Sequence, residues 1–192
     1  IPENNVGGVS SNVIAFWPNG RECLLDKAQP QREFDFLFES AGPGCTFLMT
    51  PWLIGKVRTQ LQDNNSLAKD VALHDWLTYA VCRVHGRKWI IDSAPSVKYR
   101  QHHGNVVGAN VGISAKWGRL QKLRQQWYRN EVIKIAYVCY KISARPDIDK
   151  LIKLLEKKNL YSLAKLLVNS PKYRRKGLDR LLLAGALFTG LF

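Results

Sequence analysis

The chain has 192 residues, of which 46% are hydrophobic and 10% aromatic, so it can bury a domain-sized core and is neither disordered nor collagen-like. Up to Asp75 it holds 6 basic and 9 acidic residues, but from Trp76 onward 23 basic and 6 acidic residues, and the whole chain carries a formal charge of +14. The basic C-terminal part predicts a polyanionic partner, either nucleic acid or an anionic membrane surface.

Strands and helices are expected to alternate in the first part of the chain. A strand is predicted at Val9–Phe16, before a Pro-Asn-Gly turn, and another at Cys45–Met49, after a Gly-Pro-Gly loop. Thr50 offers a hydroxyl that caps a helix, and the proline that follows is preset for the first helical position. We therefore expect a helix at about Pro51–Leu61.

A second helix is predicted over Leu73–His85, because apolar side chains recur there at helical spacing. Gly86 should end that helix in a left-handed conformation. Two short strands are expected next, at Trp89–Ile91 and Val97–Arg100, with a turn at Ser93–Pro95 between them.

From about residue 115 the composition becomes basic and helical. Trp117, Leu120, Leu123 and Trp127 recur at helical spacing between Lys and Arg residues, which predicts a basic amphipathic helix. After a break at Arg145-Pro146, further helices are expected over residues 148–155, 160–168 and 178–188. We therefore divide the chain into an α/β part, residues 1–115, and a basic all-helical extension, residues 116–192.

The cysteines, the lengths of the apolar segments and the first residue indicate where the protein is located and whether the sequence is complete. Cys23, Cys45, Cys82 and Cys139 lie far apart without zinc-ligand spacing, which predicts reduced, mostly buried thiols of a cytosolic protein. No segment reaches the ~18 consecutive apolar residues that a membrane-spanning helix needs. The first residue is Ile and no signal peptide follows, so we expect the chain to begin inside a longer protein.

The tripeptide His74-Asp75-Trp76 falls at the expected start of a helix, where backbone amides and the helix dipole favour a carboxylate. One interpretation is structural: Asp75 caps the helix and Trp76 packs in the core. The other is functional: Asp75 is a catalytic base that faces a cleft, and Trp76 stacks on a sugar ring. The pattern alone favours the structural interpretation.

Two loops could bind a ligand. After the last strand, Arg100, Gln101 and His102 place a guanidinium, an amide and an imidazole together. Arg suits a two-point contact with phosphate oxygens, and neutral imidazole suits a divalent metal, although such histidines are also often structural or solvated. In the Gly-Pro-Gly loop, Gly42 and Gly44 let backbone amides approach a ligand closely, or simply form a turn.

Asp147 and Asp149 match the bare Asp-x-Asp pattern of many metal-dependent sugar transferases. They open a Lys-rich helix, where two acids complement the helix dipole, whereas a metal-binding pair should end a hydrophobic strand. We therefore interpret them as a decoy. The chain also lacks the P-loop, dinucleotide-binding, nucleophile-elbow and zincin motifs, which disfavours those enzyme classes.

Three segments in this order and spacing resemble the C-terminal half of a bacterial family 2 glycosyltransferase, and most closely the rhamnosyltransferases of O-antigen and other surface-polysaccharide synthesis. They are Glu39–Phe47, His74–Trp76 and Tyr99–Gly108. The resemblance covers roughly residues 9–115. It implies a partial GT-A type α/β fold, a mixed sheet with flanking helices, and an inverting transferase that moves a sugar from a nucleotide diphosphate donor such as dTDP-rhamnose to a lipid-linked saccharide.

Carried over residue by residue, the resemblance makes Asp75 the base that deprotonates the acceptor hydroxyl. Gly42, Gly44 and Trp76 would border the acceptor. Arg100 and Gln101 would contact the donor diphosphate, and His102 would be a candidate metal or phosphate contact.

In this family the N-terminal half supplies the nucleotide-binding strands and the Asp-x-Asp that holds Mg²⁺ or Mn²⁺ on the diphosphate. The present sequence begins after that point, so the main metal ligands are missing and we expect the chain alone to be inactive. The basic helices would bind the anionic inner face of the bacterial plasma membrane, where lipid-linked substrates sit.

Two other functions compete with this one. A nucleic-acid-binding module is supported only by charge and by the Trp and Tyr residues, and it has no groove-reading motif. A membrane-surface adaptor without catalysis is the third possibility. Vesicle binding and duplex DNA binding, each across a salt series, would separate a membrane-bound enzyme from a nucleic-acid module.

Overall fold

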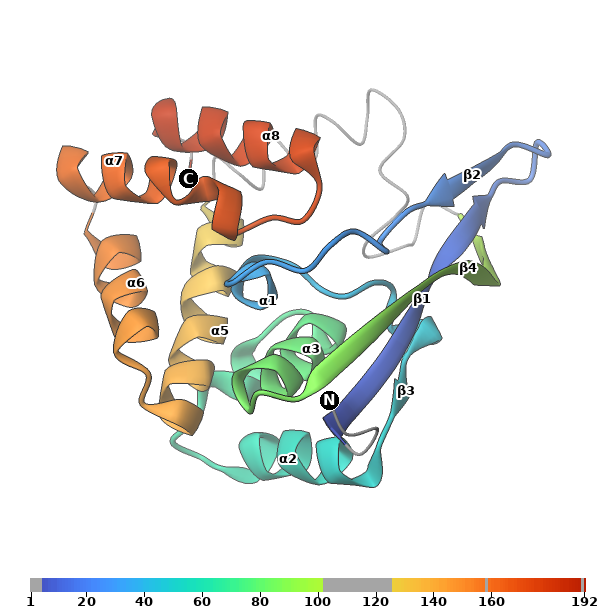
Figure 1. Cartoon of the computed structure of the whole chain (residues 1–192), viewed down its shortest axis with the longest axis horizontal. Helices are drawn as coiled ribbons and strands as arrows, with labels where there is room; N and C mark the ends of the chain where they lie inside the picture. Colours follow the sequence, from blue (N-terminus) through green and yellow to red (C-terminus); the bar gives the residue numbers. More distant parts are fainter. Residues whose placement is uncertain (1–4, 102–125, 158, 191) are drawn as a thin grey trace.

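The computed structural model describes residues 5–101, 126–157, 159–190 and 192. Figure 1 shows a mixed sheet at one side of the molecule and four C-terminal helices at the other, with three further helices between the sheet and these helices or beside the sheet. The α/β class predicted from the sequence is confirmed. The described part contains no helix that is both long and apolar enough to cross a bilayer.

Strand β1 (Val6–Phe16) is the centre of the sheet. On one side it pairs antiparallel with β2 (Glu22–Leu25), through a turn in which Gly20 has a φ of 80°, and with β3 (Leu48–Met49). On the other side it pairs in parallel with β4 (Lys88–Arg100). The strand predicted at Val9–Phe16 is therefore confirmed and extended.

The structure corrects two strand predictions. The Ser93–Pro95 segment is not a turn between two strands but an irregularity within β4, where the register steps from Ser11↔Asp92 to Val13↔Val97. Asn12 holds it in place, because its Nδ2 donates to the Ser93 carbonyl at 3.0 Å. The strand expected at Cys45–Met49 is wrong in its first half, where η2 (Gly44–Thr46) turns instead and only Leu48–Met49 pairs.

Local capping chemistry sets the helices of the first part. Helix α2 (Pro51–Gln62) begins as predicted, with the Thr50 hydroxyl accepting from the Leu53 amide at 3.3 Å. Helix α3 (His74–Val84) ends before Gly86, whose φ of 72° is the expected left-handed conformation. Two short elements were not predicted, α1 (Asp35–Phe38) and η3 (Leu67–Asp70).

Four helices form the described C-terminal part: α5 (Trp127–Ser143), α6 (Pro146–Glu156), α7 (Leu160–Val168) and α8 (Gly177–Phe188), with η4 (Ser170–Lys172) between the last two. The predicted break at Arg145-Pro146 separates α5 from α6. The last three helices lie within two residues of their predicted ends. Most of the predicted basic helix between Trp117 and Trp127, and the boundary predicted near residue 115, lie outside the described residues.

The core is continuous between the α/β elements and the C-terminal helices. Val132, Ile135 and Cys139 of α5 are fully buried in the same cluster as Trp76 and Val81 of α3. Hydrogen bonds of buried charged side chains also link these elements. The carboxylate of Glu131 accepts from the Ala72 amide at 2.8 Å, and the buried Arg129 guanidinium donates to the carbonyls of Leu155 and Phe192.

All four cysteines are free thiols. Cys82 and Cys139 are buried, Cys23 is partly buried and Cys45 is exposed. Burial raises the pKa of the Cys82 thiol to about 11, which keeps this thiol protonated and unreactive. The prediction of reduced thiols therefore agrees with the structure, with Cys45 as the exposed exception.

Candidate functional site

Asp75 lies in the first turn of α3, in a partly buried position. Its Oδ1 accepts a hydrogen bond from the Trp76 amide at 2.7 Å, while Oδ2 accepts none from the residues that the structure describes. Burial raises the pKa of this carboxyl, although the amide hydrogen bond and the neighbouring His74 work in the opposite direction. A carboxylate that holds protons more tightly than usual is a stronger base.

The Gly-Pro-Gly loop packs directly against His74 and Asp75. A Cβ added at Gly44 would lie 2.9 Å from His74 Nε2 and 3.3 Å from Asp75 Cβ, so only glycine lets the two segments approach this closely. The Thr46 hydroxyl donates to the Pro43 carbonyl at 2.8 Å and holds the turn. The structure thus brings together two motifs that are separate in the sequence.

Lys27 is a functional candidate that the sequence analysis missed. Its side chain runs past the same loop, with carbons 3.8 and 3.9 Å from a Cβ built at Gly42, and its charge acts on Asp75. Burial lowers the pKa of the Lys27 ammonium, which makes no hydrogen bond or ion pair with any described residue. Its backbone is fixed by Asn12, whose Oδ1 accepts from the Lys27 and Ala28 amides at 2.6 and 3.0 Å.

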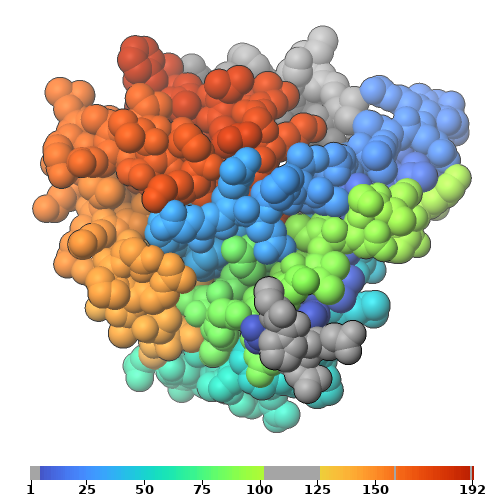
Figure 2. Space-filling view, viewed as in Figure 1, coloured from blue at the N-terminus to red at the C-terminus, as the bar shows by residue number. Residues whose placement is uncertain are grey.

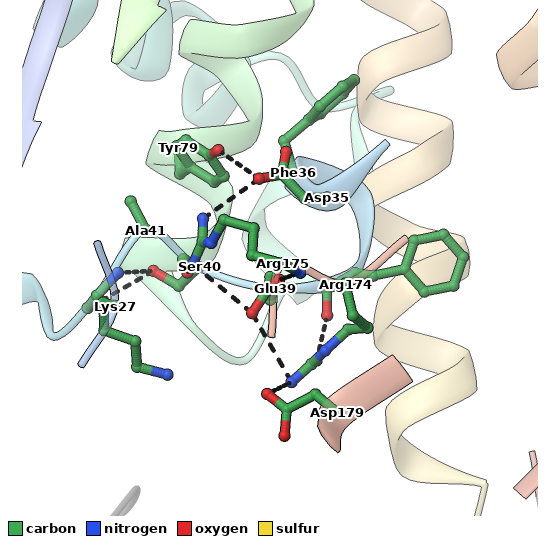
Figure 3. Close-up of polar contacts among 12 residues, drawn as sticks. Lys27, Asp35, Phe36, Glu39, Ser40, Ala41, Tyr79, Arg174, Arg175 and Asp179 are labelled. Carbon is green, nitrogen blue, oxygen red and sulfur yellow. Dashed lines mark hydrogen bonds and ion pairs between the residues drawn. The ribbon is translucent and has the colours of Figure 1, made fainter. Parts of the chain in front are cut away.

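A buried polar cluster fixes the residues just before the glycine loop (Figure 3). The Arg175 guanidinium, from the segment between α7 and α8, donates to the Ser40 carbonyl at 2.5 Å and lies 3.4 Å from Asp35 Oδ2. Glu39 Oε1 accepts from the Arg175 amide at 2.6 Å. Arg174 donates to the Phe38 carbonyl at 2.9 Å and to Asp179 at 3.0 Å.

This cluster, comprising Asp35, Glu39, Arg174, Arg175 and Asp179, was also missed from the sequence. Arg175 lies 140 residues from Asp35, and no local spacing relates the two. The only signal available was the pair of basic residues within the Lys172–Lys176 connection. The cluster orients the backbone that leads into Gly42, and among the described residues none of its members forms a hydrogen bond or ion pair with Asp75.

Trp76 does not border a cleft. It is 2% exposed, its Nε1 donates to the Phe36 carbonyl at 3.0 Å, and its ring stacks on Tyr128 with centroids 5.8 Å apart. The expected stacking on a sugar would need a free face of this ring. The structural interpretation therefore holds for Trp76, and we leave this residue out of the proposed acceptor site.

Arg100 and Gln101 lie at the far end of β4, away from the glycine loop. Arg100 is exposed and pairs in register with Phe16, and the Gln101 backbone amide donates to the Phe16 carbonyl at 2.8 Å. The glycine loop instead contacts the middle of β1, where the Ser11 carbonyl lies 3.6 Å from a Cβ built at Gly42. Ser11 and Phe16 are five residues apart along the strand, which is about 16 Å.

The metal expected from the resemblance finds no cluster of ligands among the described residues, where no three His, Cys, Asp or Glu side chains converge. The candidate ligand His102 lies outside those residues. Asp147 and Asp149 have other partners, because Asp147 pairs with Arg145 at 2.5 Å and Asp149 with Lys153 at 2.6 Å. The described residues thus do not fit a metal site.

The sequence is 47% identical over 133 residues to the dTDP-rhamnosyl transferase RfbG of Shigella flexneri. This match covers 69% of the present chain and 46% of that protein, so the chain spans about half the length of the curated relative that it matches. No protein-family model matches the chain, and no solved structure matches it. The resemblance to rhamnosyltransferases predicted from the three motifs is confirmed.

Proposed function

We propose that this chain is the acceptor-side part of an inverting rhamnosyltransferase, with Asp75 as its catalytic base. The donor would be dTDP-rhamnose, and the acceptor a hydroxyl of a lipid-linked saccharide in O-antigen or other surface-polysaccharide synthesis. The observation that carries this proposal is the Asp75 carboxylate, which has one oxygen without a hydrogen-bond partner among the described residues and lies against the Gly44 turn. The similarity to a dTDP-rhamnosyl transferase supports the choice of donor.

The proposed reaction requires a group that accepts the proton of the acceptor hydroxyl. Asp75 Oδ2 removes the proton from the acceptor hydroxyl, and the oxygen forms a bond with the anomeric carbon of the sugar. The bond between that carbon and the diphosphate breaks on the opposite face, and dTDP leaves with the electron pair. Partial burial assists because it raises the proton affinity of the carboxylate.

Other residues would position the substrates. The backbone at Gly42 and Gly44 would border the acceptor beside Asp75, since no side chain at Gly44 blocks this approach. Lys27 would add positive charge next to the same loop. Arg100 and Gln101 are proposed donor diphosphate contacts at the end of β4, and they belong to a more distant part of the site than Asp75.

The fold and setting belong to the same proposal. The mixed sheet would be one part of a GT-A type family 2 domain, with the nucleotide-binding part supplied from outside this sequence, together with any Mg²⁺ or Mn²⁺ site. The chain alone would then be inactive. We place the enzyme in the bacterial cytoplasm, on the anionic inner face of the plasma membrane where its lipid-linked acceptor is held.

The test is Asp75→Asn in the protein translated from its complete gene, with dTDP release measured on a lipid-linked saccharide. The variant keeps the size of the side chain but cannot accept the proton, so we expect turnover to fall about 10²–10⁴-fold. The affinity for dTDP-rhamnose, measured by calorimetry, should stay within about twofold. The substitution removes a group that acts on the acceptor proton in the transition state and leaves the contacts with the donor intact.

Asp149→Asn is the matched control. It makes the same chemical change in the first turn of α6, where Asp149 is partly exposed and pairs with Lys153. We expect this variant to turn over like the parent. Equal turnover in the Asp75 and Asp149 variants would show that Asp75 is not the base.

A further inference from the structure

Helix α7 carries apolar side chains on its solvent-exposed face, where a surface helix normally has polar residues. Leu160, Tyr161 and Val168 are 86%, 66% and 76% exposed, and Ala164 between them is exposed as well. These four positions lie within one arc of the helix, because residues three and four apart share a face. The opposite face carries the buried Leu166.

Helix α8 repeats this pattern. Leu181 and Phe188 are 72% and 84% exposed, and Leu178 and Leu182 are 60% and 56% exposed. Leu183, Ala186 and Leu187 of the same helix face the core. The helix therefore has apolar side chains on both its buried and its exposed sides.

The two exposed faces belong to neighbouring helices. Helices α7 and α8 contact each other, and Figure 2 shows them as one continuous stretch of surface, coloured orange to red. We call the seven large exposed side chains of these helices the α7–α8 face: Leu160, Tyr161, Val168, Leu178, Leu181, Leu182 and Phe188. Exposed apolar side chains gathered on two neighbouring helices are typical of a site of interaction.

Three lysines, which we call the basic rim, lie on α7 or just before α7 and α8. Lys157, Lys165 and Lys176 are exposed and form no ion pair with any described residue, and the Lys165 ammonium lies 5.7 Å from the Tyr161 ring. The sequence from residue 159 to 192 contains a single acid, Asp179, whose carboxylate pairs with Arg174 at 3.0 Å. The basic rim is thus not neutralised by neighbouring carboxylates.

We propose that the α7–α8 face docks on the surface of an anionic lipid bilayer. The apolar side chains would enter the boundary between headgroups and acyl chains, while the lysines of the rim contact anionic headgroups. This pairing of apolar centre and basic rim complements a membrane better than a nucleic acid, which offers no apolar layer. The inference deepens the proposed function, since it assigns the surface that holds the enzyme next to a lipid-linked acceptor.

Vesicle flotation of the full chain tests the proposal. We expect binding to vesicles of phosphatidylcholine with phosphatidylglycerol and much weaker binding to phosphatidylcholine alone. Leu181→Ser combined with Phe188→Ser should weaken binding to the anionic vesicles at least about tenfold, because two inserting side chains are lost. Both positions are exposed, so circular dichroism of the variant should match the parent.

Leu48→Ser combined with Ile54→Ser is the matched control. These side chains are 73% and 50% exposed on β3 and α2, and the double variant should bind vesicles like the parent. Equal binding by the parent and the Leu181/Phe188 variant would overturn the proposal. A parent protein that does not bind the anionic vesicles would also overturn it. If that parent is a dimer and the Leu181/Phe188 variant is a monomer, the α7–α8 face is a protein interface instead.

The two proposals fail separately. Vesicle binding does not require catalysis, so Asp75→Asn should float with anionic vesicles as the parent does. If the protein binds vesicles through the α7–α8 face but its turnover survives Asp75→Asn, the docking proposal is supported and the proposed role of Asp75 as base is wrong. Asp75-dependent turnover without vesicle binding would do the reverse.

Discussion

Asp35 and Asp75 occupy similar places in the chain. Each lies in the first turn of a helix, each is followed by an aromatic residue that is 2% exposed, and burial raises the pKa of each carboxyl. Their surroundings differ. Asp35 accepts from Tyr79 at 3.0 Å and pairs with Arg83 at 3.0 Å, and Arg175 approaches it from the other side.

Asp75 has only a backbone amide as its hydrogen-bond donor among the described residues. A buried carboxylate surrounded by cations and a hydroxyl is fixed in position and holds elements together. A partly buried carboxylate without a paired cation keeps a lone pair for a substrate proton. The comparison therefore gives Asp35 a structural role and leaves Asp75 available for the proposed chemistry, and three substitutions test this difference.

Asp35→Ala should have the largest effect. It leaves the guanidiniums of Arg83 and Arg175 in a buried site without their carboxylate, so we expect the free energy of unfolding to fall by about 3–5 kcal/mol. Urea unfolding measures this loss. Glu22→Ala is the control, because the Glu22–Lys98 pair is about half exposed and such pairs contribute about 0–1 kcal/mol. Similar losses for both variants would remove the distinction between the two aspartates.

Gly44→Ala should have an intermediate effect. The new Cβ would displace the exposed His74 ring and press on Asp75, so we expect a loss of about 1 kcal/mol in stability and a clear loss of turnover in the protein from the complete gene. Gly55→Ala is the matched control, since nothing lies within 4 Å of its Cβ in α2. That variant should gain about 0.5–1 kcal/mol. Unchanged turnover in Gly44→Ala would separate the loop from the catalytic step.

Asp75→Asn should have the smallest effect on stability, and with opposite sign. The pKa of Asp75 is higher in the folded than in the unfolded chain, so its contribution to stability is present at low pH and is lost as pH rises through the folded pKa. At neutral pH the asparagine variant should therefore melt about 2 °C above the parent. The difference should close as pH falls toward the ordinary aspartate range. Melting curves at several pH values measure it, and a pH-independent difference would contradict the assigned environment.

Local signals predicted much of the fold. The Thr50 cap, the Gly86 stop and the apolar periodicity of α6, α7 and α8 act within a few residues, and the structure agrees with each. Strand β2 and the irregular middle of β4 were not predicted. Both depend on contacts across the fold, such as the Asn12 amide that donates to the Ser93 carbonyl.

The candidate site likewise contains residues that could be predicted from the sequence and residues that could not. Motif order predicted the neighbourhood of Asp75 and Gly44, and the structure places them together. Burial could not be predicted for Trp76, because an aromatic after a helix start is equally compatible with a core and with a sugar-binding surface. Lys27 lies in a segment whose sequence shows no recognisable motif or periodicity. Only its position beside Gly42 in the folded chain makes it a candidate.

The segment between α7 and α8 matters for anyone who wishes to shorten the protein. Arg174 and Arg175 reach back to Phe38 and Ser40, across the boundary predicted near residue 115 (Figure 3). Cutting the chain after α6 would remove the helices of the α7–α8 face, but it would also leave the buried Glu39 carboxylate without Arg174 and Arg175 and take Arg175 away from Asp35. A shortened protein has to keep α8 and Phe192 as well, because Leu183, Leu187 and Phe192 are buried in the core and Arg129 donates to the Phe192 carbonyl.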